Sequence, residues 1–169
     1  MNLRPIILPA LAMAAIVLVS NVLVQFPLNA WLTWGAFSYP VAYFVTDVCN
    51  RVSGPQLARK VAWIGFGVGL VFSAILAPVR IALASGTAFI VSQLLDVQVF
   101  NRWRRASWWK APLMGSLIGS ALDTVIFFTM SFAPAFGFLG ANDDFAIGLA
   151  PLFGVLAIEA PRWISWAVA

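Results

Sequence analysis

Residues 6–26 read IILPALAMAAIVLVSNVLVQF, a stretch without one charged side chain. A helix needs about 20 apolar residues to cross the hydrocarbon core of a bilayer, which is roughly 30 Å thick. The stretch therefore predicts a membrane-spanning helix. A secretory signal peptide is the alternative, but this apolar run is long for a signal and several further runs follow it.

Further apolar runs of spanning length lie along the chain, at residues 33–50, 61–77, 81–100 and 112–132, and the first two spans are joined by a predicted turn at 27–31. The run at 145–158 is shorter and contains glycine and proline, which favours a re-entrant or interfacial segment. Residues 163–169 resemble the first turns of one more helix, cut short. A helix of that length is too short to span, so we expect it to be poorly ordered or docked against the span at 112–132.

These runs predict the fold class. We expect an all-α integral membrane protein forming a single transmembrane domain over residues 1–169. Its parts are a bundle of five full transmembrane helices, the re-entrant or interfacial segment and a truncated sixth helix. The composition agrees, since 62% of the 169 residues are hydrophobic and only 9% are charged, and the mean hydropathy is +0.94. Soluble domains are about half apolar and a quarter charged.

The same composition excludes several kinds of chemistry. The chain has one cysteine, Cys49, and no histidine, so it has no internal disulfide, no histidine-based metal site and no Ser-His-Asp triad. Neither Asp47 nor Asp123 stands in the Gly-x-Gly-Asp setting of an intramembrane aspartyl protease. We therefore expect no enzyme activity, no metal and no cofactor.

Basic residues collect on one side of the predicted bundle. Eight of the ten lysines and arginines precede the first span or lie in the connections after the second and fourth spans. Cytoplasmic loops of membrane proteins are enriched in these residues, so we expect the amino terminus and both connections in the cytoplasm. The eight are Arg4, Arg51, Arg59, Lys60, Arg102, Arg104, Arg105 and Lys110. Only Arg80 and Arg162 are assigned to the opposite side.

Three aspartates lie within predicted spans, where a carboxylate costs about 2.5–3.5 kcal/mol even on the insertion scale. Asp47 and Asp96 are near helix ends, and each has the alternative of pairing with a loop arginine, Arg51 or Arg102. Asp123 is about 16 Å into its span, near the midplane, and has no such partner. It is the strongest candidate for function.

Polar side chains share helix faces with these acids, at the spacings that align residues on one face. A cavity lined by carboxylates, amides, hydroxyls and aromatic rings would suit a flat, hydrogen-bonding heterocycle. The alternative is that serine and glycine only allow close helix packing. The groups are Ser116, Ser120, Asp123 and Phe127; Ser85, Ser92 and Asp96, with Gln93 adjacent; Pro40, Tyr43 and Asp47; and Asn21 with Gln25 on the first span.

Several separate motifs, in order over about residues 33–132, resemble the queuosine precursor transporters, also called the vitamin uptake transporter family. The resemblance implies six-helix proteins of the bacterial inner membrane that import a 7-deazaguanine base, such as 7-cyano-7-deazaguanine or its aminomethyl analogue. The motifs are TWGAFSYP (33–40), TD (46–47), GPQLARK (54–60), RIALAS (80–85), QLLDVQVFNR (93–102), WWKAP (108–112) and SLIGSALDT (116–124). The departure is the last helix, which ends here at Ala169.

Taken with the resemblance, the polar faces give a set of substrate-binding candidates. Carboxylates would accept hydrogen bonds from the N–H edge of the base, and aromatic rings would stack on it. We expect the lipid bilayer and the small 7-deazapurine as partners and no nucleic acid, and homo-oligomer formation is open. The alternative functions are a substrate-binding subunit of an energy-coupling-factor-type vitamin transporter and a structural membrane protein. The candidates are Asp123, Asp96, Asp47, Gln93, Tyr43, Phe37, Ser38, Phe127 and Asn21.

Overall fold

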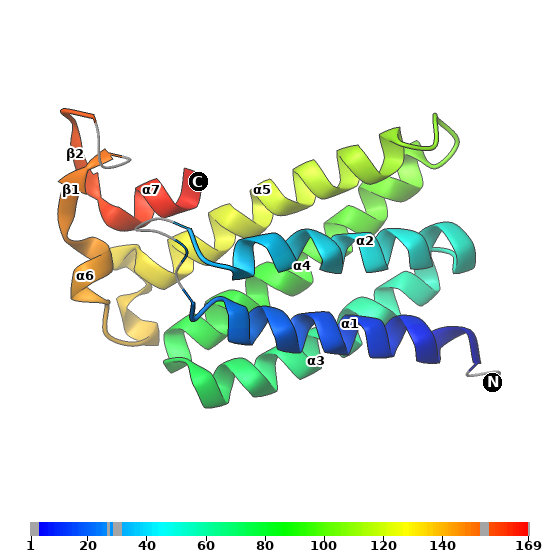
Figure 1. Cartoon of the computed structure of the whole chain (residues 1–169), viewed down its shortest axis with the longest axis horizontal. Helices are drawn as coiled ribbons and strands as arrows, with labels where there is room; N and C mark the ends of the chain where they lie inside the picture. Colours follow the sequence, from blue (N-terminus) through cyan, green and yellow to red (C-terminus); the bar gives the residue numbers. More distant parts are fainter. Residues whose placement is uncertain (1–3, 27, 29–31, 153–155, 169) are drawn as a thin grey trace.

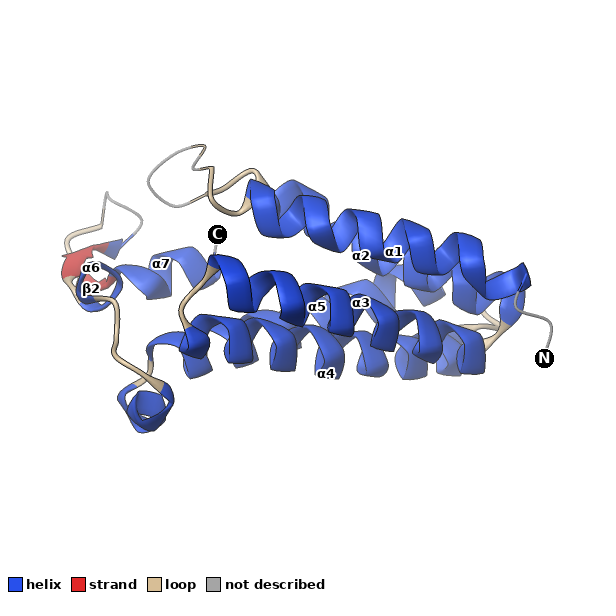
Figure 2. Ribbon diagram, turned by 90° about the horizontal axis from the view of Figure 1, so that it is seen from below, coloured by secondary structure: helices blue, strands red, loops and turns tan. Residues whose placement is uncertain are grey.

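The computed structural model describes residues 4–26, 28, 32–152 and 156–168. Five long helices run side by side along the long axis of the molecule, and the shorter C-terminal elements gather at one end of it (Figures 1 and 2). Apart from Leu28, the predicted turn at 27–31 lies outside the described residues. The helices are α1 (Arg4–Leu23), α2 (Gly35–Ser53), α3 (Pro55–Leu76), α4 (Val79–Trp103) and α5 (Lys110–Phe132).

A single residue connects α2 to α3. Gly54 has a φ of 88°, a left-handed conformation that glycine adopts without steric cost. Pro55 opens α3, where the missing N–H is not needed. The helix therefore starts before the apolar run at 61–77, and Arg59 and Lys60 are exposed on its first turns. We call this end of the bundle, which also holds the α4–α5 connection, the basic end, and the opposite end the far end.

Within the described part of the chain, α1, α3, α4 and α5 are long and apolar enough to cross a membrane. They support the all-α, multi-pass membrane fold that the sequence predicts. The remaining predicted span, at 33–50, corresponds to α2, which is 19 residues long but is not among these four. Its spanning role stays a prediction.

Helix α2 is polar inside and apolar outside. Its buried positions include Ser38, Thr46, Asp47 and Asn50, while its exposed face is a stripe of large apolar side chains. A helix in a membrane bundle is expected to turn its polar groups inward, because lipid cannot hydrogen-bond them. This arrangement explains the low average hydropathy of α2 and supports placing it in the membrane. The exposed stripe is Phe37, Val41, Phe44, Val48 and Val52.

After α5 the chain forms short elements at the far end: η1 (Pro134–Leu139), α6 (Asp144–Ile147), β1 (Leu149–Pro151), β2 (Glu159–Pro161) and α7 (Arg162–Val168). The apolar run at 145–158 thus contains a short helix and the first of two paired strands, and its re-entrant or interfacial placement stays a prediction. Ala150 lies opposite Ala160 in the antiparallel ladder. Gly148 and Pro151 disfavour a helix here, which allows the strands to pair. Its residues 153–155 lie outside the described part.

The short helix α7 docks on the end of α5, as expected from the sequence. The ring of Trp163 stacks on Phe132 with centroids 6.4 Å apart, and Trp166 contacts the same ring edge-on at 6.1 Å. Arg162, just before them, places its guanidinium 4.4 Å from the ring centroid of Phe145. Aromatic and cation–π contacts therefore hold this helix in place.

Arg80, one of the two basic residues assigned to the side opposite the basic loops, is buried at the far end of the bundle. It lies in the first turn of α4 and is only 2% exposed. Its guanidinium donates to the carbonyl oxygens of Met130 (2.9 Å), Ala133 (2.7 Å) and Gly140 (3.2 Å). Carbonyls at the end of a helix lack intrahelical donors and carry partial negative charge, so a cation is favoured there. Arg80 joins the start of α4 to the end of α5 and to η1.

Candidate functional site

The three aspartates of the predicted spans come from three neighbouring helices, and we call them the acid cluster. Asp47 on α2 is 4% exposed and Asp96 on α4 is completely buried, and their carboxyl groups lie against each other. Asp123 on α5 is half-buried and accepts a hydrogen bond from the Ser92 hydroxyl at 3.2 Å. The three acids, each predicted to lie on the polar face of its own helix, thus lie in one region of the bundle.

Glycines on α5 leave the space that the acid cluster occupies. A Cβ atom at Gly115 would collide with Oδ1 of Asp96, and one at Gly119 would lie 2.8 Å from Cε1 of Tyr43. Close approach of helix backbones at small residues is common in membrane bundles. Here the missing Cβ atoms make room for a carboxyl group and an aromatic ring rather than for another helix alone.

Several polar atoms of this region have no hydrogen-bond partner among the described residues. They include both carboxylate oxygens of Asp96, Oδ1 of Asp47 and Nε2 of Gln93. While Asp47 and Asp96 are both ionised, neither can donate to the other. Buried polar groups are nearly always satisfied in folded proteins, so a group of open acceptors beside an open donor fits a place that receives a polar ligand or water.

The alternative pairing of these acids with loop arginines is not seen in the described structure. Arg51 is exposed and donates to the Trp108 carbonyl oxygen at 2.6 Å, at the basic end. The oxygens of Asp96 have no hydrogen-bond partner, so no bond to Arg102 is formed. Asp47 does receive one bond, a long one of 3.5 Å from the Ser116 hydroxyl.

Side chains of α2 and α4 fix the position of Gln93 beside the acid cluster. The Thr46 hydroxyl donates to Oε1 of Gln93 at 2.6 Å. This bond orients the carboxamide so that its Nε2 donors are free. One turn closer to the basic end, Asn50 donates to the Val97 carbonyl at 3.2 Å and also joins α2 to α4. Thr46 and Asn50 are not among the predicted site residues, although Thr46 follows Tyr43, and Asn50 follows Asp47, by the three residues that align side chains on one helix face.

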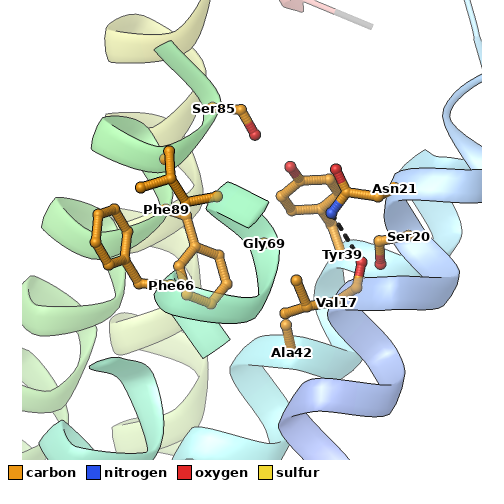
Figure 3. Close-up of a pocket in the computed structure, with 11 residues that line it drawn as sticks. Val17, Ser20, Asn21, Tyr39, Ala42, Phe66, Gly69, Ser85 and Phe89 are labelled. Atoms are coloured by element: carbon orange, nitrogen blue, oxygen red, sulfur yellow. Dashed lines mark hydrogen bonds between the residues drawn. The ribbon is translucent and has the colours of Figure 1, made fainter. Parts of the chain in front are cut away.

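A second polar region lies between the acid cluster and the far end. Two adjoining hollows there share Ser20, Asn21, Tyr39 and Ser85 in their walls, and contain about 360 and 500 Å³ of empty space, part of which is open to the outside. We call them together the neutral cavity, because none of the described residues that line them is charged. Figure 3 shows Tyr39 between Ser85 and the side chains of α1. Two predicted site residues, Asn21 and Phe127, belong here and not to the acid cluster.

The structure separates Phe37 and Ser38 from both regions. Phe37 is 58% exposed and packs beside Trp34 with ring centroids 6.1 Å apart. Ser38 is buried but donates to the Gly35 carbonyl at 2.8 Å, within its own helix. Tyr43, by contrast, is buried beside Gly119 and Asp96, as a site residue would be.

A family model described as "Putative vitamin uptake transporter" matches residues 33–79 and 72–158 of the chain. The matched ranges contain α2 to α6 and all three members of the acid cluster. No solved structure matches the chain.

Curated relatives carry related names. The chain is 38% identical over 139 residues to "Queuosine precursor transporter" of Escherichia coli, an alignment that covers 67% of this chain and 62% of the relative. It is 34% identical over 121 residues to "Probable queuosine precursor transporter" of Haemophilus influenzae, covering 59% and 52%. A Bacillus subtilis protein with that same name is 30% identical over 128 residues, covering 59% and 56%.

The chain thus spans between 52% and 62% of the length of these relatives. The family match nevertheless covers more than half of this chain, in one series that includes the bundle and its acids. This protein belongs to the vitamin uptake transporter family.

Proposed function

We propose that this protein imports a queuosine precursor, a 7-deazaguanine base such as 7-cyano-7-deazaguanine or its aminomethyl analogue. The names of the relatives support a substrate of this class. The observation that carries the proposal is the group of buried, unpartnered carboxylate oxygens on neighbouring helices. An ionisable group kept inside a membrane bundle without a structural partner is by default a functional one.

The chemistry of the acid cluster matches the edge of such a base. A guanine-type edge presents adjacent N–H donors, and a carboxylate accepts two of these in a bidentate way. Asp123 and Asp96 supply acceptors in our proposal, Asp47 supports Asp96, and Gln93 offers donors to a carbonyl or ring nitrogen. Tyr43 supplies a ring face for stacking.

We also propose that the basic end faces the cytoplasm. Eight of ten basic residues lie before α1 or near the α2–α3 and α4–α5 connections, and cytoplasmic loops are enriched in lysine and arginine. Reporter fusions at Lys60 and Asn142 should therefore report opposite sides of the membrane. The same side for both would overturn the orientation.

The experiment for the function is uptake of labelled 7-cyano-7-deazaguanine into cells that cannot make the precursor. Asp123→Asn should reach the membrane at normal levels, because the change removes a costly buried charge and keeps the acceptor for Ser92. The new amide would direct N–H donors at the donors of the base. We expect an apparent affinity about 30- to 1,000-fold weaker, equivalent to about 2–4 kcal/mol.

The matched control is Asp144→Asn, the same change at an exposed acid in α6, which should leave uptake unchanged. If Asp123→Asn restores queuosine as well as the unmodified protein does, Asp123 is not the recognition residue. If the unmodified protein shows no uptake of the base at all, the proposed function is wrong.

A further inference from the structure

The neutral cavity has polar groups that the bundle does not satisfy. Ser20 is buried on α1 and faces both hollows, and its hydroxyl has no partner among the described residues. A hydroxyl buried in a membrane bundle ordinarily bonds a carbonyl one turn earlier on its own helix, as Ser38 does with Gly35. The unpaired Ser20 hydroxyl at a hollow therefore marks a position where a ligand atom can bond it.

Asn21 is held in one orientation at the same wall. The Ser73 hydroxyl donates to its Oδ1 at 2.7 Å, and its Nδ2 donates to the Val17 carbonyl at 2.9 Å (Figure 3). A carboxamide has two donors and two acceptor lone pairs, so one donor and one acceptor remain. The side chain is thus fixed in place while half of its hydrogen-bonding capacity stays free for a ligand.

Tyr39 lines both hollows of the neutral cavity and lies near the acid cluster. Its hydroxyl lies beside Ser85, and Asp123 is close enough to act on it electrostatically. Phe66 and Phe89 add ring surface to the smaller hollow, and Phe127 lines the larger one. The cavity therefore combines free hydroxyl and amide groups with aromatic faces, and no formal charge lines it among the described residues.

We propose that the neutral cavity is a second binding site for the same planar heterocycle, which the base occupies in its uncharged form before or after it contacts the acid cluster. The inference rests on the proposed function. Neutral hydroxyl and amide groups can pair with both donors and acceptors of a base without the desolvation cost of a carboxylate.

Thiol protection tests the site separately from the acids. Ser20→Cys and Gln25→Cys, each in a Cys49→Ala background, place one reactive thiol in the cavity. Gln25 is exposed at the edge of the cavity, so the thiol of Gln25→Cys is labelled even if the buried thiol of Ser20→Cys reacts slowly. With 7-cyano-7-deazaguanine as the probe, the rate at which a thiol reagent labels the cysteine should fall about tenfold when the base occupies nine-tenths of the cavities. Ala141→Cys, exposed in the loop before α6, is the control and should show no protection.

The decisive arm adds Asp123→Asn to the same cysteine variants. If the cavity binds the base on its own, protection persists at similar concentrations although uptake falls. Loss of protection together with Asp123 would mean that the base binds only at the acid cluster, and the inference would fall. Uptake by the unmodified protein without any protection would also overturn the second site alone, whereas absence of uptake would overturn the proposed function on which it rests.

Discussion

Helix α4 buries two ionisable side chains, one basic and one acidic, and the bundle provides hydrogen-bond partners for only the basic one. Arg80, in the first turn at the far end, donates hydrogen bonds to three carbonyl oxygens. Asp96, toward the basic end, is buried even more completely, yet neither of its oxygens has a partner among the described residues. Burial alone therefore does not tell what a charge inside a membrane bundle is for.

The difference lies in what the fold gains from each charge. A buried ion costs several kcal/mol unless hydrogen bonds offset the loss of water. The bonds of Arg80 supply that offset and tie α4 to the end of α5, so this cation stabilises the fold. Asp96 gains no such bonds and lies against the carboxyl group of Asp47, so an ionised Asp96 would oppose folding. We infer that Arg80 is structural and that Asp96 is kept for the ligand.

The largest effect should follow removal of the structural charge. Arg80→Met leaves three partly buried carbonyl oxygens without their donor, and each such loss in a fully buried position costs about 1–3 kcal/mol. We expect thermal unfolding in detergent at a much lower temperature and little protein in the membrane. Arg59→Met, the same change at an exposed position of α3, is the matched control and should unfold near the normal temperature. Equal stability of the two variants would remove the contrast with Asp96.

Asp96→Asn should show the reverse pattern. The new amide can donate to Asp47, so the unfolding temperature should stay the same or rise. Uptake of the base should fall, with an apparent affinity about 10- to 150-fold weaker, because a charge-assisted hydrogen bond contributes about 1.5–3 kcal/mol. A variant that is less stable but transports normally would assign Asp96 to the fold instead.

The smallest effect tests the space that holds Asp96. Gly115→Ala puts a methyl group against its carboxyl, which must move, while Gly67→Ala on α3 meets nothing within 4 Å. Overpacking of this kind costs about 1–3 kcal/mol. We expect several-fold weaker uptake from the first variant and normal uptake from the second, at similar membrane levels. Equal uptake by both would mean that the carboxyl position tolerates displacement.

The position of the acids could be predicted from the sequence because helical spacing aligns residues along one face. The same reasoning placed Asn21 and Phe127 with the acids, whereas the structure puts them at the neutral cavity. It also expected Phe37 to stack on the ligand, and the structure turns that ring outward. Spacing orders residues around one helix, but the rotation of each helix depends on its neighbours, which no single segment encodes.

The sequence by itself determined the class, the approximate spans and the uneven distribution of basic residues. These depend on transfer free energies that add up residue by residue along a helix. Only the tertiary structure decided which polar atoms have hydrogen-bond partners. Arg80 donates to Gly140 and Ser73 donates to Asn21, and the two residues of each pair are far apart in the sequence. A hydrogen bond depends on distance and angle between two particular atoms. The arrangement of open and satisfied groups that separates the acid cluster from the neutral cavity therefore appears only when the helices pack.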